Sequence, residues 1–259
     1  MPLTAEQIAQ FITEGFVTLE RAFPLDIGQQ CRKELWAATG YDPDTPSTWA
    51  QPYIRMESFG TPAFRQAANT PSLHEAFDQL VGAGRWTALT GLGTFPLRFP
   101  SRDEPAEAGW HLEAGFAGIG GEPRVNLRSR GRALLMLFLF SDIESDDAPT
   151  RIRVGSHLDV PAVLAPFGED GMTTIELSGV LGDSASRPLA LATGRPRRLR
   201  LSPLPGSCRP DAPGNIPTLH GPTPVGGSLR PAGRPARWRP LAGRAGDPAG
   251  SGPQLTRPR

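Results

Sequence analysis

The chain has 259 residues, with 27 basic and 26 acidic side chains. This length is sufficient for one domain with a substantial hydrophobic core, or for two small ones. Its longest apolar run, Ala133 to Phe140, is too short to span a membrane, and the N-terminus lacks the basic and apolar regions of a signal peptide. Two cysteines, Cys31 and Cys208, indicate neither a disulfide framework nor a cysteine metal site. We therefore expect a reduced, cytoplasmic protein without a membrane segment.

Composition and charge change abruptly near Arg195. The residues from Arg195 to the end hold twelve of the 27 basic residues, all of them arginine, but only two of the 26 acidic ones. They also hold fourteen of the 29 prolines and ten of the 30 glycines, and their one aromatic residue is Trp238. Such a composition buries too little apolar surface to offset the entropy cost of ordering the chain. We expect a folded domain over 1–194 and a disordered tail over 195–259.

The N-terminal part, residues 1–85, carries the signals of several packing helices. Thr4 begins a capping-box pattern that is followed by apolar residues at helical spacing. Asp26 is a candidate cap for a second helix. A further capping-box pattern begins at Ser72, and His74 in that helix is expected to face solvent.

The hydrophobic period changes to that of strands over residues 86–194. Short strands separated by Gly, Pro and acidic turns, after a group of helices, predict a sandwich or barrel backed by helices. The apolar run 134–140 predicts a strand buried on both faces. The expected strands are 16–19, 86–90, 94–99, 109–116, 133–140, 151–154 and 173–177.

The segment Gly109 to Phe116 carries the most informative polar pair. In an extended strand, successive side chains alternate between faces, so His111 and Glu113 would point the same way. Two groups that ligate metals would then lie on one face. The same spacing is also compatible with an ordinary strand whose two polar side chains face water.

Three stretches together resemble the phytanoyl-CoA dioxygenase family. Residues 4–19 (TAEQIAQFITEGFVTL) resemble the opening of the family, and GWHLEAGF is similar to its His-x-Asp metal segment. Residues 137–161 are similar to its core strand, acidic turn and Gly-Ser-His. The resemblance covers about 4–193. It implies a mainly β fold with N-terminal helices, a double-stranded β-helix (jelly roll, cupin-like), which we expect to be incomplete at its C-terminal strands.

The resemblance also implies a non-haem Fe(II) oxygenase that hydroxylates a small-molecule substrate with 2-oxoglutarate and O2 as cosubstrates. Two histidines and one carboxylate on one face of the iron leave three positions for the 2-oxo acid and O2. By resemblance, His111 and Glu113 are metal ligands and catalytic residues. Glu113 stands where the family usually has Asp. Its extra methylene requires either the iron to shift or the side chain to fold back.

The third metal ligand is missing from the expected set. The resemblance assigns His157 to a turn that does not ligate iron, and His220 lies in the tail without a strand pattern around it. In the family, the distal His and a 2-oxoglutarate-binding Arg follow a segment like 189–194. We hypothesise that a single-nucleotide frameshift near Arg195 has replaced both. Re-read one base later with synonymous codons, the tail gives a strand-like stretch with a histidine at the codon of Ser207 and an arginine further on. We therefore expect this chain to be poorly active and prone to aggregation.

Other functions are compatible with the same sequence. A metal-binding cupin-like protein, whether non-catalytic, a hydrolase or an isomerase, would use the same pair, and a polyanion-binding protein would use the basic tail. The tail lacks interleaved aromatic residues and any repeat, so nucleic acid is not the expected partner. An acidic ligand is also compatible with Arg98, Arg102, Arg151 and Arg153, but we expect these to be solvated strand and loop charges.

Overall fold

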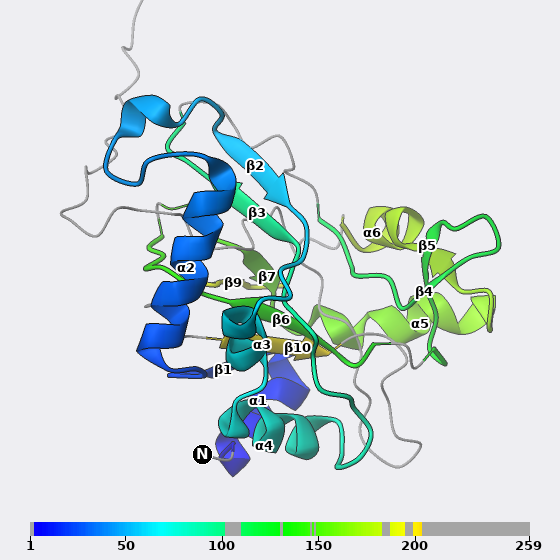
Figure 1. The fold of residues 1–259 in the computed structure, drawn as a ribbon. Helices are drawn as coiled ribbons and strands as arrows, with labels where there is room; N and C mark the ends of the chain where they lie inside the picture. The colour runs from blue at the N-terminus through cyan, green and yellow to red at the C-terminus, as the bar shows by residue number, and fades with distance from the viewer. Residues whose placement is uncertain are drawn as a thin grey trace, which may run out of the picture.

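The structure, a computed structural model, describes residues 3–101, 110–129, 132–145, 147, 149–182, 187–194 and 199–203. Helices and short antiparallel strands are mixed along these ranges, and the strands form four separate sheets with no closed barrel among them (Figure 1). The expected mainly β fold with its helices confined to 1–85 is wrong in this respect. One strand that the sequence did not predict, Tyr53–Met56, precedes residue 86, and two α-helices, Val160–Leu164 and Thr174–Gly182, follow it.

Four α-helices lie in the N-terminal part. The helix α1 begins at the predicted capping box: Thr4 Oγ1 accepts from Gln7 N at 3.2 Å, and Gln7 Oε1 accepts from Thr4 N at 3.0 Å. No helix in the described part of the chain combines the length and apolar character that crossing a membrane requires. The bounds are α1 (Ala5–Glu14), α2 (Leu25–Thr39), α3 (Pro62–Ala68) and α4 (Pro71–Leu80), with a 3-10 turn η1 (Pro46–Thr48).

Two of the predicted helix caps are wrong. The helix α2 begins one residue before Asp26, which lies in its first turn, where a carboxylate is favoured by the helix dipole. Thr70 rather than Ser72 caps α4, and Thr70 Oγ1 accepts from Leu73 N at 3.3 Å. Pro71 decides the second case, because proline is favoured at the first helical position and places the cap on the residue before it.

The strands belong to four small antiparallel sheets. The central sheet has the order β1 (Val17–Leu19), β10 (Leu199–Pro203) and β6 (Leu134–Phe138). The other sheets contain β2 (Tyr53–Met56) with β3 (Phe95–Arg98), β4 (Phe116–Ala117) with β5 (Pro123–Val125) and β8 (Met172–Thr173), and β7 (Arg151–Arg153) with β9 (Leu189–Leu191). The remaining elements are η2 (Ser156–Leu158), α5 (Val160–Leu164), η3 (Ala165–Phe167) and α6 (Thr174–Gly182).

Four predicted strands are confirmed as β1, β3, β6 and β7, but two others are not strands. Residues 86–90 have no regular structure, because Asn69 satisfies the backbone there: its Nδ2 donates to Leu89 O at 2.7 Å and its Oδ1 accepts from Leu89 N at 2.9 Å. The predicted strand 173–177 is mostly α6. Thr173 and Glu176 bond each other reciprocally, at 2.9 Å and 3.2 Å, which starts a helix instead.

The strand β10 corrects the expectation that the whole tail is disordered and that no strand follows 189–194. It pairs antiparallel with β1 on one side and β6 on the other, with Leu201 opposite Val17 and Met136. Backbone donors and acceptors pair whatever their side chains are, so this segment completes a sheet despite its unusual composition. Residues 204–259, where the rest of the predicted disorder falls, lie outside the described residues.

Apolar side chains bury both faces of β6. The largest apolar cluster contains residues of all four N-terminal helices, α1 through α4, together with Phe138 and Phe140. Leu137 points the other way, into a cluster with Ile152 of β7. The prediction of a strand buried on both faces is therefore confirmed for 137–140, whereas residues 134–136 are half-buried.

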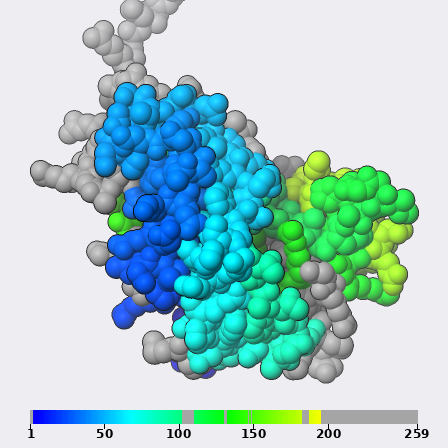
Figure 2. Space-filling model, viewed as in Figure 1, coloured from blue at the N-terminus to red at the C-terminus, as the bar shows by residue number. Residues whose placement is uncertain are grey.

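A third apolar cluster lies apart from the first two. It contains Leu112 and Val125 together with buried residues of α5 and α6. In Figure 2 the green and yellow-green residues of this part form a lobe beside the blue and cyan N-terminal residues. The candidate metal segment is therefore attached to this lobe.

Cys31 lies in the largest cluster and is fully buried. Burial and, to a smaller extent, the nearby carboxylate of Glu34 together raise the pKa of its thiol to about 12. A thiol that stays protonated at neutral pH is a poor nucleophile and a poor metal ligand. Its environment therefore does not favour metal binding by this thiol.

Replacement of Phe64 should test the largest cluster. Its side chain is fully buried and its ring lies 5.0, 5.3 and 5.8 Å from those of Phe59, Phe95 and Phe140. We expect Phe64→Ala to lower the free energy of unfolding by about 3–5 kcal/mol, measured by urea denaturation. The control Phe167→Ala removes a half-exposed ring and should change it by no more than about 0.5 kcal/mol. Equal losses would contradict this description of the core.

Candidate functional site

The predicted metal pair lies outside the named strands, although His111 itself forms an isolated β-bridge. The predicted strand over 109–116 is wrong in extent, because the ladder of β4 begins only at Phe116. The alternation of sides is nevertheless present. Leu112 is buried in the lobe cluster, whereas His111 is exposed and Glu113 is half-buried. The burial of Leu112 therefore directs its two polar neighbours to the opposite side.

The two side chains meet on that side. His111 Nε2 lies 3.7 Å from Glu113 Oε1, with 46% and 32% of the side chains exposed. One divalent transition-metal ion bonds such atoms at about 2.1 Å, so two ligands of one ion lie less than about 4.2 Å apart. The pair therefore fits two positions around a single ion. Its half-exposed setting leaves room for further ligands from solution.

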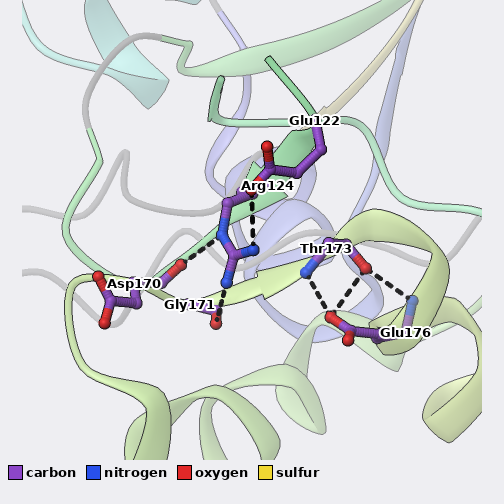
Figure 3. A network of polar contacts seen from close by, with 6 residues as sticks. All are labelled: Glu122, Arg124, Asp170, Gly171, Thr173 and Glu176. Carbon is purple, nitrogen blue, oxygen red and sulfur yellow. Dashed lines mark hydrogen bonds and ion pairs between the residues drawn. The ribbon is translucent and has the colours of Figure 1, made fainter. Parts of the chain in front are cut away.

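Polar contacts of the Arg124 side chain hold the loop that precedes β8 against β5 (Figure 3). Arg124 Nε donates to Asp170 O at 2.8 Å and its Nη2 donates to Gly171 O at 3.1 Å. Its Nη1 also donates to Glu122 Oε1 at 3.1 Å. A charged group that satisfies two backbone carbonyls fixes the loop more firmly than neutral bonds would.

The strand β5 also holds the metal segment in place. Gly115 N donates to Arg124 O at 2.9 Å, two residues after Glu113. Leu112 belongs to the same apolar cluster as Val125 of β5. The burial of this side chain and the backbone hydrogen bond to β5 therefore help to set the position of the pair.

The described residues contain no group of three His, Cys, Asp or Glu side chains placed to hold a metal ion. His157 is buried in η2, where its Nε2 donates to Ile12 O at 2.8 Å, so its role is to hold α1. The prediction that His74 on α4 faces solvent is wrong. It packs on the Trp86 ring at 4.6 Å, because the irregular segment 86–90 folds back over the helix. His220 lies outside the described residues.

Most of the arginines that we expect to be solvated charges are instead buried or half-buried. Arg153 is buried beneath Trp110, with its guanidinium carbon 4.3 Å from the ring centroid and Nη1 donating to Leu181 O at 2.8 Å. Arg151 is half-buried over the same ring at 5.3 Å, and Arg98 is buried over a tyrosine ring. Aromatic faces attract guanidinium groups and shield them from water. Arg102 lies outside the described residues.

Sequence reasoning missed one contact of the pair. Arg132 Nη1 donates to Glu113 Oε2 at 3.5 Å, although the two residues are 19 positions apart. No helical or strand spacing links residues at that separation. The contact exists only because the chain returns past the pair before it enters β6.

Comparisons with known proteins give distant structural similarities. No protein-family model matches the chain, and no curated protein matches it. Apo HygX from Streptomyces hygroscopicus is 18% identical over 88% of this chain and 82% of its own, with a TM-score of 0.46. EctD from S. alaskensis, solved with 2-oxoglutarate and 5-hydroxyectoine, is 20% identical over 89% and 72%, with a TM-score of 0.47. SnoK, a non-heme alpha-ketoglutarate-dependent carbocyclase from nogalamycin biosynthesis, is 15% identical over 87% and 80%, with a TM-score of 0.45. At these low identities and TM-scores, the similarities do not establish the activity of this chain.

The environment of His157 predicts a pH dependence of stability. Burial lowers the pKa of its imidazole, and the positive charge of Arg187 lowers it further. The hydrogen bond to Ile12 O and the carboxylate of Asp159 oppose this shift. The unfolded chain therefore binds a proton more readily than the folded chain does, and stability should fall as the pH drops below about 6.5.

Replacement of His157 by Gln tests this prediction. Glutamine keeps an N–H donor for Ile12 O but has no proton to gain. We expect His157→Gln to flatten the pH dependence of the urea midpoint between neutral pH and pH ~5. The control His74→Gln removes a half-buried histidine and should leave that dependence in place. An unchanged profile in His157→Gln would contradict the assignment.

Proposed function

We propose that this chain is a non-haem Fe(II)/2-oxoglutarate-dependent oxygenase that hydroxylates a small-molecule substrate, impaired at its C-terminal part. The observation that carries the proposal is the 3.7 Å separation of His111 Nε2 and Glu113 Oε1 on one side of the segment. That segment resembles the metal segment of the phytanoyl-CoA dioxygenase family. The fold that goes with the proposal is a double-stranded β-helix backed by helices, over 1–194 and continued by β10.

The residues of the chain have distinct parts in this activity. Fe(II) with 2-oxoglutarate and O2 supplies the oxidising chemistry that hydroxylates an unactivated C–H bond. His111 and Glu113 would hold the metal, and Leu112 keeps both directed to one side. HygX structures contain iron, or nickel with 2-oxoglutarate, and EctD was also solved with iron. In this chain the same metal and cosubstrate would bind at the pair.

The proposed impairment is the loss of a third metal ligand and of a 2-oxoglutarate-binding arginine in the part of the chain after β10. We propose that a single-nucleotide shift near Arg195 replaced the distal His and the 2-oxoglutarate-binding Arg. In support, β10 lies between β1 and β6 shortly before Ser207, whose codon, with a suitable synonymous choice, can be re-read as a histidine. Two ligands hold a metal far less firmly than three, and an arginine fork sets the geometry of a bound carboxylate.

Anaerobic titration tests the metal pair. We expect Fe(II) to bind the purified chain weakly, and His111→Ala and Glu113→Ala each to lower the affinity by at least about tenfold, as loss of a ligand costs no less than loss of an outer partner. Calorimetry measures the affinity, and 2-oxoglutarate should add a visible absorption band only with Fe(II) present. His74→Ala is the control histidine. Metal binding that ignores both substitutions would contradict the proposal, and binding without any 2-oxoglutarate response would favour a cupin-like hydrolase or isomerase.

Restoration of the alternative frame tests the impairment. A chain re-read by one nucleotide from Arg195 onward should gain a distal histidine and an arginine. We expect it to consume O2 and decarboxylate 2-oxoglutarate, while the present chain does so poorly and aggregates more readily, because β10 completes only the central sheet and the strands expected after it no longer cover the edges of the others. Oxygen uptake and light scattering of the two purified chains measure both effects. Robust 2-oxoglutarate turnover by the present chain would contradict the proposed impairment.

A further inference from the structure

The contact between Arg132 and Glu113 involves the oxygen that does not face the histidine. Glu113 Oε1 lies 3.7 Å from His111 Nε2, and Glu113 Oε2 accepts from Arg132 Nη1 at 3.5 Å. The two carboxylate oxygens therefore have different neighbours. One faces the imidazole nitrogen, and the other faces a permanently charged donor.

A glutamate at this position needs such a partner more than an aspartate would. Its side chain has one more rotatable bond than that of aspartate, so the carboxylate has more orientations to lose when it binds a metal. A free glutamate would also extend away from a histidine two residues earlier. In the structure it does not: Oε1 turns back toward Nε2, and the contact with Arg132 lies on its outer side.

Arg132 approaches from a separate part of the fold. It lies two residues before β6, whose first residue Leu134 packs against the large N-terminal cluster. Leu112, between the two members of the pair, belongs to the lobe cluster instead. The guanidinium thus links a residue anchored in the lobe to a strand anchored in the N-terminal body. The guanidinium therefore reaches Glu113 from outside the metal segment.

We propose that Arg132 is a positioning residue that orients the Glu113 carboxylate for metal binding and compensates for the extra methylene of glutamate. This inference rests on the proposed function, because it requires His111 and Glu113 to bind the metal. Arg132 itself touches neither metal nor substrate in this role. It acts through the carboxylate, as hydrogen-bonded partners of metal ligands generally do.

Co(II) titration of the full-length chain tests the proposal with a readout other than activity. We expect Arg132→Gln to weaken Co(II) binding about threefold to tenfold by calorimetry, which is less than such partners typically contribute, because the arginine side chain is 59% exposed. The visible Co(II) spectrum should change as well, since the carboxylate geometry changes. Arg132→Lys keeps the charge and a donor and should recover part of the affinity.

A matched control and a coupled variant separate positioning from general charge. Arg128→Gln removes a neighbouring exposed arginine that pairs with Glu169 at 3.0 Å, and it should leave Co(II) binding unchanged. Glu113→Asp retracts the carboxylate by about 1.5 Å, beyond easy reach of the guanidinium. In that background, Arg132→Gln should have little further effect, so the two substitutions should not be additive.

The outcomes distinguish this inference from the proposed function. An Arg132→Gln chain that binds Co(II) as tightly as the original, or more tightly, overturns the positioning role, and the second result identifies Arg132 as a competitor of the metal. If His111→Ala and Glu113→Ala still abolish binding in that case, the metal pair itself stands. If those two variants bind normally, the proposed function fails first. Retained near-ultraviolet circular dichroism in each variant excludes unfolding as the cause.

Discussion

Burial of Leu112 is the interaction on which the candidate site depends. Its side chain packs into the lobe with Val125, and a hydrogen bond from Gly115 to Arg124 holds the same segment to β5. Because successive side chains of an extended chain alternate sides, this burial leaves His111 and Glu113 together on the other side. The pair does not belong to a strand ladder. The burial of Leu112 and the backbone bond to β5 take the place of the strand that the spacing predicts.

The charged residues around the site owe their positions to packing. Arg153 lies buried on Trp110, where the ring face and the carbonyl of Leu181 offset part of the cost of desolvating its charge. Arg132 reaches Glu113 from the start of β6 and remains half-exposed. The first arginine joins β7 to α6, whereas the second adjoins the proposed metal ligands. Both are strand-associated arginines in the sequence, and only their surroundings separate a structural role from a functional one.

One segment of the tail with unusual composition, β10, is part of the central sheet. Backbone pairing places Leu199–Pro203 between β1 and β6, in the middle of the central sheet. Main-chain hydrogen bonds tolerate almost any side chain except an interior proline, and Pro203 lies at the end of the strand. The sheet can therefore be completed by residues whose composition suggests disorder. Metal ligation has no such tolerance, because it requires one particular side chain at one position.

The sequence by itself determined the local features that depend on a few neighbouring residues. These include the capping box at Thr4, the strands β1, β3, β6 and β7, and the common side of His111 and Glu113. Only the tertiary structure decided the features that depend on distant partners. Hydrogen bonds from the Asn69 side chain take the place of the strand predicted at 86–90. The Trp110 ring covers an arginine predicted to lie on the surface, and the start of β6 places Arg132 next to Glu113. The physical reason is that periodicity and capping act within a few residues, whereas desolvation and ion pairing depend on which segments the fold places side by side.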